Sequence, residues 1–378
     1  MTKFENYLPM NMLQSRLKER TEDIRGSYYR DTTAIIHCSA FRRLKHKTQV
    51  FFAPSNDHIC TRIEHSLHVA SIASAICRGL GLDNELAWAI GMGHDLGHTP
   101  FGHTGEHIID AMMKEEGLGG FEHEANSLRV VQCLYPLNLT YAVRDGIVCH
   151  CGEHFIQSIR PQEGFKDLSV LGSRKKELPS TWEGCVVRFS DQIAYLGRDF
   201  EDAVRLNLID RGDLSPEIRK VLGSTNGEII NTLVYDIIDH SSPEKGISFS
   251  EPVFEAVHDM KDFNYRRIYH STLLSSYMGY FNRLIRLVVG YIEGLYDRFG
   301  TQKEGYEGEK NMLAASFYSH MIEKKASYEA RGESLKQMIF DYVSGMTDNF
   351  CLDCANEILK PEHLNEALEG FRSGKLFD

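Results

Sequence analysis

Residues 61–106 read TRIEHSLHVASIASAICRGLGLDNELAWAIGMGHDLGHTPFGHTGE and predict two consecutive helices with histidines near their ends. In the first half, apolar side chains recur at the spacing of one helix face: Val69, Ile72, Ala73, Ile76 and Leu80. Glycines and an aspartate N-cap then separate the two helices. His65 opens the first helix, and His94 and Asp95 end the second. Two antiparallel helices with a short connection bring such ends into one neighbourhood.

Helical spacing dominates the rest of the chain as well. Further helical segments are expected at three places: 122–134, 185–207 and 315–359. Strand-like alternation is rare, and residues 50–52 (VFF) are a short candidate strand. The polar segments 161–180 and 300–308 are expected to be exposed loops. The predicted fold class is therefore all-α, with one continuous core and a C-terminal helical part packed on it.

The composition of the 378-residue chain is typical of a folded protein, with 42% hydrophobic and 25% charged residues, which excludes wholesale disorder. The formal net charge of −11 disfavours contact with nucleic acid and anionic membranes, so an anion site must be a local exception. The start MTKFENYLPM does not resemble a signal peptide. No apolar run approaches the roughly 20 residues of a membrane helix. We expect a cytoplasmic protein without a membrane anchor.

Nine cysteines are scattered along the chain, an odd number that favours reduced thiols. Two local groupings invite a metal interpretation: Cys149-His150-Cys151 with His154, and the pair Cys351 and Cys354. A closed zinc site needs four ligands, usually from two spaced pairs, and neither grouping has a second pair nearby. Ordinary thiols are the favoured interpretation of both groupings.

Donor chemistry indicates a metal centre around the His-Asp doublet. His94 and Asp95 supply one nitrogen and one oxygen ligand at a single place in the chain. His65 is expected close to them. Asp191 interrupts a strongly apolar helix, where a buried carboxylate needs a cation or a hydrogen-bond donor. Each residue alone is more readily explained as a cap or a core hydrogen-bonding group, but the set predicts four metal ligands.

Further motifs accompany the doublet in a fixed order: SAFRRL at 39–44, KTQVF at 47–51, TRIEHS at 61–66, HDLGHTPFGH at 94–103, Glu106, FEHE at 121–124 and DQIAY at 191–195. This ordered set resembles the HD-domain phosphohydrolases, and within them the deoxynucleoside triphosphate triphosphohydrolases, which include bacterial dGTPases. The resemblance implies an all-α, HD-domain helical fold with a C-terminal helical extension. It also implies a single helical domain over residues 1–378, composed of an N-terminal segment 1–54 that contributes to the active site, an HD core at about 55–210 and a C-terminal helical part at about 228–378.

The resemblance also assigns roles position by position. The implied metal ligands are the four that donor chemistry suggests: His65, His94, Asp95 and Asp191. Catalytic roles are implied for three residues: His103, its carboxylate partner Glu106, and His123. Substrate-binding roles are implied for six: Gln49, Arg62, Tyr195, Asp199, Lys261 and Tyr269. Of these, Arg62 and Lys261 are expected on the phosphates and the others near the sugar or base.

The chemistry of phosphoryl hydrolysis agrees with these roles. Water attack on an α-phosphorus needs an electrophile, a nucleophile and a protonated leaving group, which a divalent metal and an imidazole supply. His103 follows the doublet on a Gly-rich loop, and Glu106 could fix its tautomer. Positive charge concentrates in one further run, for which phosphate or structural ion-pair roles are expected: Arg42, Arg43, Lys45 and Lys47.

The reaction predicted from the resemblance is hydrolysis of a dNTP to a deoxynucleoside and tripolyphosphate. Two imidazoles and two carboxylates suit several divalent ions, with Mn or Mg expected first and Fe, Ni or Zn as alternatives. The family implies a homo-oligomer, a hexamer or tetramer, with a dNTP activator at a subunit interface. Two alternatives stay open. One is an HD hydrolase of monophosphates, cyclic nucleotides or (p)ppGpp, and the other is a nucleotide sensor or single-strand nucleic-acid binder.

Overall fold

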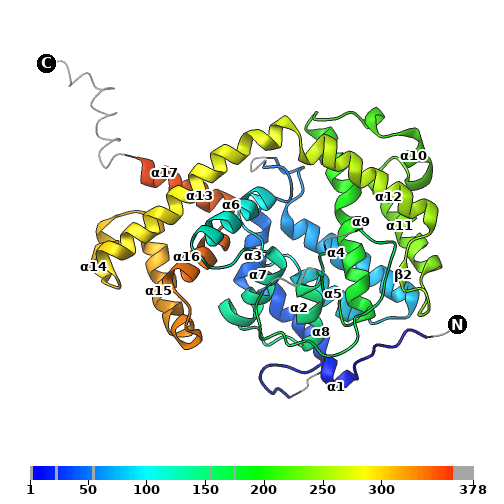
Figure 1. Ribbon diagram of the computed structural model, residues 1–378, viewed down its shortest axis with the longest axis horizontal. Coiled ribbons are helices and arrows are strands. Elements are labelled where there is room, and N and C mark those ends of the chain that lie inside the picture. The colour runs from blue at the N-terminus through cyan, green and yellow to red at the C-terminus, as the bar shows by residue number, and fades with distance from the viewer. Residues whose placement is uncertain (1–2, 22–23, 53–55, 153–154, 173–175, 361–378) are drawn as a thin grey trace.

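The computed structural model describes residues 3–21, 24–52, 56–152, 155–172 and 176–360. These residues confirm the all-α fold class, because helices form almost all of their regular structure (Figure 1). Their only strands are two short pieces, β1 (Ser158–Ile159) and β2 (Ile247–Ser248), which pair antiparallel with Ser158 opposite Ser248. Within the described ranges, no helix combines the length and apolarity needed to cross a membrane.

The first half of the chain forms the following helices: α1 (Met10–Leu13), α2 (Ser27–His37), α3 (Ser39–Arg43), the 3₁₀ helix η1 (Leu44–His46), α4 (Arg62–Leu80), α5 (Asn84–Gly93), α6 (Gly102–Glu115), α7 (His123–Arg129), the π-helix η2 (Val130–Leu134), α8 (Tyr141–Val148) and α9 (Trp182–Arg205). The helix expected at 122–134 is therefore α7 continued by η2. The helix expected at 185–207 is α9, which begins at Trp182.

The second half of the chain is also helical: the 3₁₀ helix η3 (Arg211–Asp213), α10 (Pro216–Leu222), α11 (Asn226–His240), α12 (Glu251–Asn264), the π-helix η4 (Tyr265–Tyr269), α13 (Thr272–Phe299), α14 (Lys303–Gly308), α15 (Met312–Arg331), α16 (Leu335–Ser344) and α17 (Asp348–Leu359). Figure 1 shows α13 as a long helix that passes over α6 and reaches α14 at the far end of the molecule. The helical segment expected at 315–359 is divided into α15, α16 and α17.

The pair α4 and α5 forms the centre of the fold. α4 follows the N-cap Thr61 and ends at Gly81, whose φ of 71° lies in the left-handed region that glycine tolerates. α5 follows Asp83, whose carboxylate accepts hydrogen bonds from the first turn. The two helices approach until their backbones touch, since a Cβ on Gly91 would lie 2.7 Å from Cα of Ala70. This contact fixes the start of α4 relative to the end of α5.

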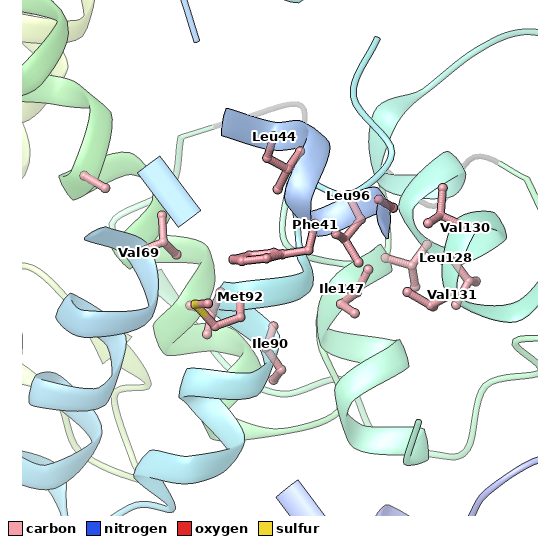
Figure 2. Close-up of a cluster of buried hydrophobic side chains, with 14 of the residues drawn as sticks. Phe41, Leu44, Val69, Ile90, Met92, Leu96, Leu128, Val130, Val131 and Ile147 are labelled. Atoms are coloured by element: carbon pink, nitrogen blue, oxygen red, sulfur yellow. The ribbon is translucent and has the colours of Figure 1, made fainter. Parts of the chain in front are cut away.

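Apolar side chains from separate helices pack around this pair. Figure 2 shows the Phe41 ring of α3 between Val69 of α4 on the left and Ile147 of α8 on the right, with Met92 of α5 below the ring. All four side chains are buried. α9 packs against α4, α5 and α8 along the same core. Burial of this apolar surface holds in place the start of α4 with His65, the end of α5 with the His-Asp doublet, and the middle of α9 with Asp191.

The C-terminal helices are hydrogen-bonded directly to the core. Asp348, at the start of α17, accepts hydrogen bonds from the backbone N–H groups of Thr48 and Phe101, each at 2.9 Å. Nζ of Lys47 donates to the carbonyl of Ser344 at 2.8 Å. The C-terminal part therefore supports the loops that lead into α4 and α6. The predicted division into an N-terminal segment, an HD core and a C-terminal part within one domain stays a prediction.

Three local predictions were wrong or incomplete. Residues 300–308 are not a simple loop, because 303–308 form α14, whose Tyr306 ring is buried. Residues 50–52 form no strand, and the ring of Phe52 instead packs edge-on against Phe101 and Phe281. The described residues of 161–180 are irregular, as expected, but Lys166 is buried among them. In each case a contact distant in sequence overrides the local signal.

Replacement of Gly91 by alanine should weaken the fold. The added methyl group would overlap the backbone of α4 at Ala70, so the helices would have to separate, at a cost of about 1–3 kcal/mol. A lower midpoint of chemical denaturation would show this. Gly290 in α13 is a matched control, because a Cβ there would meet no atom within 4 Å. Gly290→Ala should leave stability unchanged or raise it by about 0.5–1 kcal/mol, and equal effects at both positions would contradict the packing argument.

Candidate active site

One cavity of about 560 Å³ gathers nearly all of the site residues expected from the sequence. Its wall includes Gln49, Arg62, His65, Asp95, His103, His123, Asp191, Tyr195, Asp199, Lys261 and Tyr269. The remaining two, His94 and Glu106, lie behind this wall in contact with residues that form it. The wall thus brings together segments that are far apart in the chain, from Gln49 just after η1 to Tyr269 in η4.

The four predicted metal ligands converge at the inner end of this cavity. Nε2 of His65 lies 2.9 Å from Oδ1 of Asp191. Nε2 of His94 lies 3.4 Å from Oδ1 of Asp95 and 3.9 Å from Oδ1 of Asp191. Nδ1 of His94 donates to the carbonyl of Gly91 at 2.7 Å, which leaves the Nε2 lone pair facing the carboxylates.

This donor set fits a divalent cation. Nε2 of His94 is buried and has no hydrogen-bond partner within the described residues, which is unusual for a polar atom unless it serves a ligand. Two imidazole nitrogens and two carboxylate oxygens are a common set for first-row divalent ions. The hydrogen bond from Nδ1 of His94 to a backbone carbonyl is the orienting contact that metal-binding histidines usually make.

Both carboxylates are held in the ionised form. Burial alone would raise the pKa of Asp95, but His94, His98 and Arg62 hold it well below its usual range. Nη1 of Arg62 lies 2.7 Å from Oδ2 of Asp95, and Nε2 of His98 lies 3.1 Å from Oδ1. Burial likewise opposes ionisation of Asp191, but the hydrogen bond from His65 lowers its pKa to about 2.

Beside the donor set, Glu106 is shared between two imidazoles. Oε2 of Glu106 lies 3.2 Å from Nδ1 of His103, and Oε1 lies 3.0 Å from Nδ1 of His123. Burial would raise the pKa of Glu106, yet His123 and His103 keep it well below its usual range. The side chain of His103 is 63% exposed, whereas that of His123 is buried. An ionised carboxylate therefore orients an exposed imidazole at the mouth of the cavity.

The outer half of the cavity is formed by α9, α12 and η4. The hydroxyl of Tyr269 donates to Oδ2 of Asp199 at 2.6 Å, and burial raises the pKa of that carboxyl to about 7. Tyr195 lies one helical turn after Asp191 and faces the same space. Nζ of Lys261 lies 4.4 Å from the centre of the Phe155 ring. Among the described residues, no carboxylate lies within ion-pair distance of that ammonium group.

The cavity wall also contains residues to which no role in the reaction was assigned, and two of them, His150 and Cys151, form with His123 a group that could hold a metal ion. Nδ1 of His150 donates to the carbonyl of Ile147 at 2.6 Å, and its buried Nε2 has no hydrogen-bond partner within the described ranges. Sγ of Cys151 lies 3.4 Å from Nε2 of His123. The available signal was the place of His150 at the end of an apolar helix, where a buried imidazole needs a polar partner.

The other cysteine predictions can be placed as well. His154 lies outside the described residues. Cys149 is buried away from the cavity, with its Sγ 3.4 Å from Nζ of Lys166. Cys351 and Cys354 are buried in α17 and belong to no cluster of metal-binding side chains within the described part of the chain. Their burial fits the interpretation of this pair as ordinary thiols.

Comparisons with known proteins agree with this geometry. Residues 62–196 match the HD domain, and residues 247–357 match the phosphohydrolase-associated domain. A deoxyguanosinetriphosphate triphosphohydrolase-like protein of Caldanaerobacter subterraneus subsp. tengcongensis is 35% identical over 92% of this chain and 90% of its own length. A protein of the same name from Desulfatibacillum aliphaticivorans is 34% identical over 89% of each chain. The chain belongs to this HD phosphohydrolase family.

Membership confirms the resemblance inferred from the ordered motifs. The HD domain match ends at 196, shortly after Asp191, and the associated domain match covers the helices that support the site from the C-terminal side. A crystal structure of a hypothetical protein from Aquifex aeolicus superposes with a TM-score of 0.43, at 18% identity over 90% of this chain and 70% of that chain.

The raised pKa of Asp199 in this HD phosphohydrolase predicts a pH effect on stability. Its carboxyl binds a proton up to about pH 7 in the folded chain but only up to about 3.8 in the unfolded chain, so stability should fall as the pH rises between these values. Asp199→Asn keeps an acceptor for Tyr269 and cannot ionise. The melting temperature of the variant should therefore rise relative to wild type from pH 5 to pH 8.

A surface carboxylate supplies the control for this measurement. Asp259, whose side chain is 69% exposed, should give a wild-type pH profile when changed to asparagine. Parallel profiles for wild type and Asp199→Asn would contradict the assignment of a raised pKa to Asp199.

Proposed function

We propose that this chain hydrolyses deoxynucleoside triphosphates at the α-phosphorus, producing a deoxynucleoside and tripolyphosphate. The observation that carries the proposal is the convergence of His65, His94, Asp95 and Asp191 beside the exposed pair of His103 and Glu106. The relatives named for deoxyguanosinetriphosphate triphosphohydrolase activity support the same reaction class.

The four converging donors would hold one divalent cation. Mn²⁺ or Mg²⁺ is the first choice, and Fe, Ni or Zn is compatible with two nitrogen and two oxygen ligands. When bound, the ion would supply Lewis acidity to the phosphoryl group and to a water molecule. Arg62 and His98 hold Asp95 in its orientation toward His94.

His103 is placed to manage the proton of the leaving group. As water oxygen bonds to the α-phosphorus, the bond from phosphorus to the 5′ oxygen breaks, and that oxygen needs a proton. Glu106 accepts the hydrogen bond from Nδ1 of His103, which leaves Nε2 free to donate this proton. When both ring nitrogens of His103 carry a proton, Nδ1 donates to Glu106 and Nε2 donates to the leaving oxygen, while His123 holds Glu106 from the other side.

The rest of the cavity suits the triphosphate and the deoxyribose. Lys261 has no carboxylate partner within the described residues, so its charge is available to the phosphates, whereas Arg62 is already bonded to Asp95. We propose that Gln49, Tyr195, Asp199 and Tyr269 surround the sugar. A wall close to the 2′ carbon would exclude ribonucleotides by steric contact.

Assembly and location are proposals that rest on the family resemblance. We propose a cytoplasmic homo-oligomer, a hexamer or tetramer, with a dNTP activator at a subunit interface. A role as single-strand nucleic-acid binder would need a basic surface, which the net charge of −11 disfavours.

The deciding experiment is a product assay with the purified full-length chain. Each of the four dNTPs is incubated with Mn²⁺ or Mg²⁺, and the products are separated by anion exchange. Tripolyphosphate and deoxynucleoside are expected in equal amounts. Release of pyrophosphate or orthophosphate would contradict the proposal, and faster turnover of a ribonucleotide, a monophosphate or (p)ppGpp would favour another HD hydrolase.

Asp191→Ala should remove both the metal and the activity. The variant lacks one of two carboxylates, and the remaining donors would hold a divalent ion far more weakly. Metal content after dialysis, measured by mass spectrometry, checks the assignment directly. Asp199→Asn on the same helix is the control and should retain the metal. Full metal content in Asp191→Ala would overturn the ligand set.

His103→Ala should separate chemistry from binding. Loss of an acid–base group typically lowers turnover by about 10²–10⁴-fold, whereas metal content and nucleotide affinity should stay close to wild type. Single-turnover rates and equilibrium dNTP binding measure the two effects. His258→Ala, at a side chain that is 58% exposed on α12, is the control. An unchanged rate in His103→Ala would rule out the proposed proton transfer.

A further inference from the structure

A second cavity of about 330 Å³ lies between the HD core and the C-terminal helices. From the core side its wall includes Arg43, Leu96, Asn126 and Tyr135. From the other side α15 contributes His320 and Lys324, and α16 and α17 close the space. None of the residues with predicted metal, catalytic or substrate-binding roles lies in its wall, so the proposed reaction does not account for it.

Two cationic side chains, Arg43 and Lys324, line this second cavity beside Tyr135. Nη1 of Arg43 donates to the hydroxyl of Tyr135 at 3.0 Å, and its guanidinium carbon lies 5.5 Å from the centre of the same ring. Nζ of Lys324 lies 5.2 Å from that ring centre. Nε of Arg43 is buried without a hydrogen-bond partner, and no carboxylate lies within 4 Å of the guanidinium, among the described residues. Two cations therefore gather around one tyrosine.

His320 adds a third nitrogen group to this cluster. Its Nε2 is buried and has no hydrogen-bond partner within the part of the chain that the structure describes. Burial, followed by the charge of Lys324, lowers the pKa of His320 to about 4, and Arg43 acts in the same direction. His320 therefore lies in the positive field of Lys324 and Arg43, which an anion bound between these groups would offset.

The acidic side chains nearby do not neutralise this cluster. Asp341 lines the cavity, but its carboxylate accepts bonds from Nε and Nη2 of Arg129 at 2.9 and 2.6 Å and from the Tyr328 hydroxyl at 2.6 Å. Glu323 contacts Nζ of Lys324 at 2.8 Å, yet its side chain is 69% exposed and such surface pairs contribute little. The interior of the cavity therefore keeps an excess of positive charge.

We propose that this second cavity binds an oligophosphate group, carried either by a free polyphosphate or by a nucleotide. Among the described residues, Arg43 has no carboxylate within 4 Å and Lys324 pairs only with the exposed Glu323. Arg and Lys side chains in such a setting are the usual receptors for phosphate oxygens. The volume lies at the lower end of the range for small-molecule sites. The hydroxyls of Ser316 and Tyr342 in the wall supply further hydrogen-bonding groups.

The bound group would touch the back of the active site. Leu96 in the cavity wall directly follows Asp95 in the chain, and Nδ2 of Asn126 donates to the carbonyl of Gly97 at 2.7 Å. Only one turn of chain therefore separates the second cavity from the predicted metal ligands. This site lies within a single chain and is distinct from an activator site at a subunit interface.

Calorimetric titration of the full-length chain with inorganic tripolyphosphate, in buffer with EDTA, tests the proposal without reference to hydrolysis. Lys324→Gln removes a charge from the cavity and should weaken one binding event about tenfold or more. Lys325→Gln removes the neighbouring charge, whose side chain is 46% exposed and faces Glu329, and should bind as wild type does. Equal affinities in wild type and Lys324→Gln, or equal losses in both variants, would overturn the proposal.

A site-specific measurement guards against binding elsewhere in the molecule. In histidine-labelled protein, tripolyphosphate should raise the pKa of His320 by about one unit or more, as a nearby opposite charge does, and His320→Gln identifies the signal. An unchanged pKa at a saturating concentration would overturn the proposal. Titration with a non-hydrolysable dNTP analogue distinguishes a nucleotide from a free polyphosphate as the natural ligand. If the Lys324-dependent event is tighter with the analogue than with tripolyphosphate, the ligand is a nucleotide. If it is weaker with the analogue, the ligand is a free polyphosphate.

Discussion

The structure depends on the burial of two carboxylates at the point where three helices meet. Asp95 is almost fully buried, and Asp191 lies 2.9 Å from a buried imidazole. An ionised carboxylate in such a place is costly unless cations or donors surround it. The Arg62 guanidinium, the imidazoles of His65, His94 and His98, and the proposed metal ion would all offset the same cost. A core built only for stability would place apolar side chains here.

The buried carboxylates need their neighbours held in fixed positions, and the close bonding of the C-terminal helices to the core contributes to this at the turn before α6. Phe101 has a φ of 62°, a left-handed conformation that costs a residue with a side chain about 1–3 kcal/mol. Asp348 accepts the N–H of Phe101, and the Phe101 ring stacks on Phe281 of α13 at 4.2 Å. The C-terminal part thereby holds the turn that starts α6 and sets the position of His103 relative to Asp95.

Sequence reasoning reached the helices because they are encoded locally, and it reached most of the candidate site because the ordered motifs resemble a known family. The apolar period around Val69 and Ile76 predicts α4, and the doublet at the end of the next helix places two donors at once. The roles assigned to these residues stay predictions, but the structure brings them into one cavity. His150 and α14 were missed because their environment depends on tertiary contacts, of His150 with His94 and of Tyr306 in α14 with Tyr318 of α15.

The basic run between Arg42 and Lys47 shows why a charge pattern leaves its role open. Lys47 is buried, and its ammonium donates to the carbonyls of His98 and Ser344. It therefore joins the loop between α5 and α6 to the end of α16. Burial lowers its pKa well below the usual range, and its neighbour Arg43 lowers it further. Arg43 itself faces the second cavity. The structural interpretation therefore applies to Lys47, whereas a phosphate role for Arg43 rests on the proposal for the second cavity, because the chain turns through η1 between the two residues and separates their side chains into different environments.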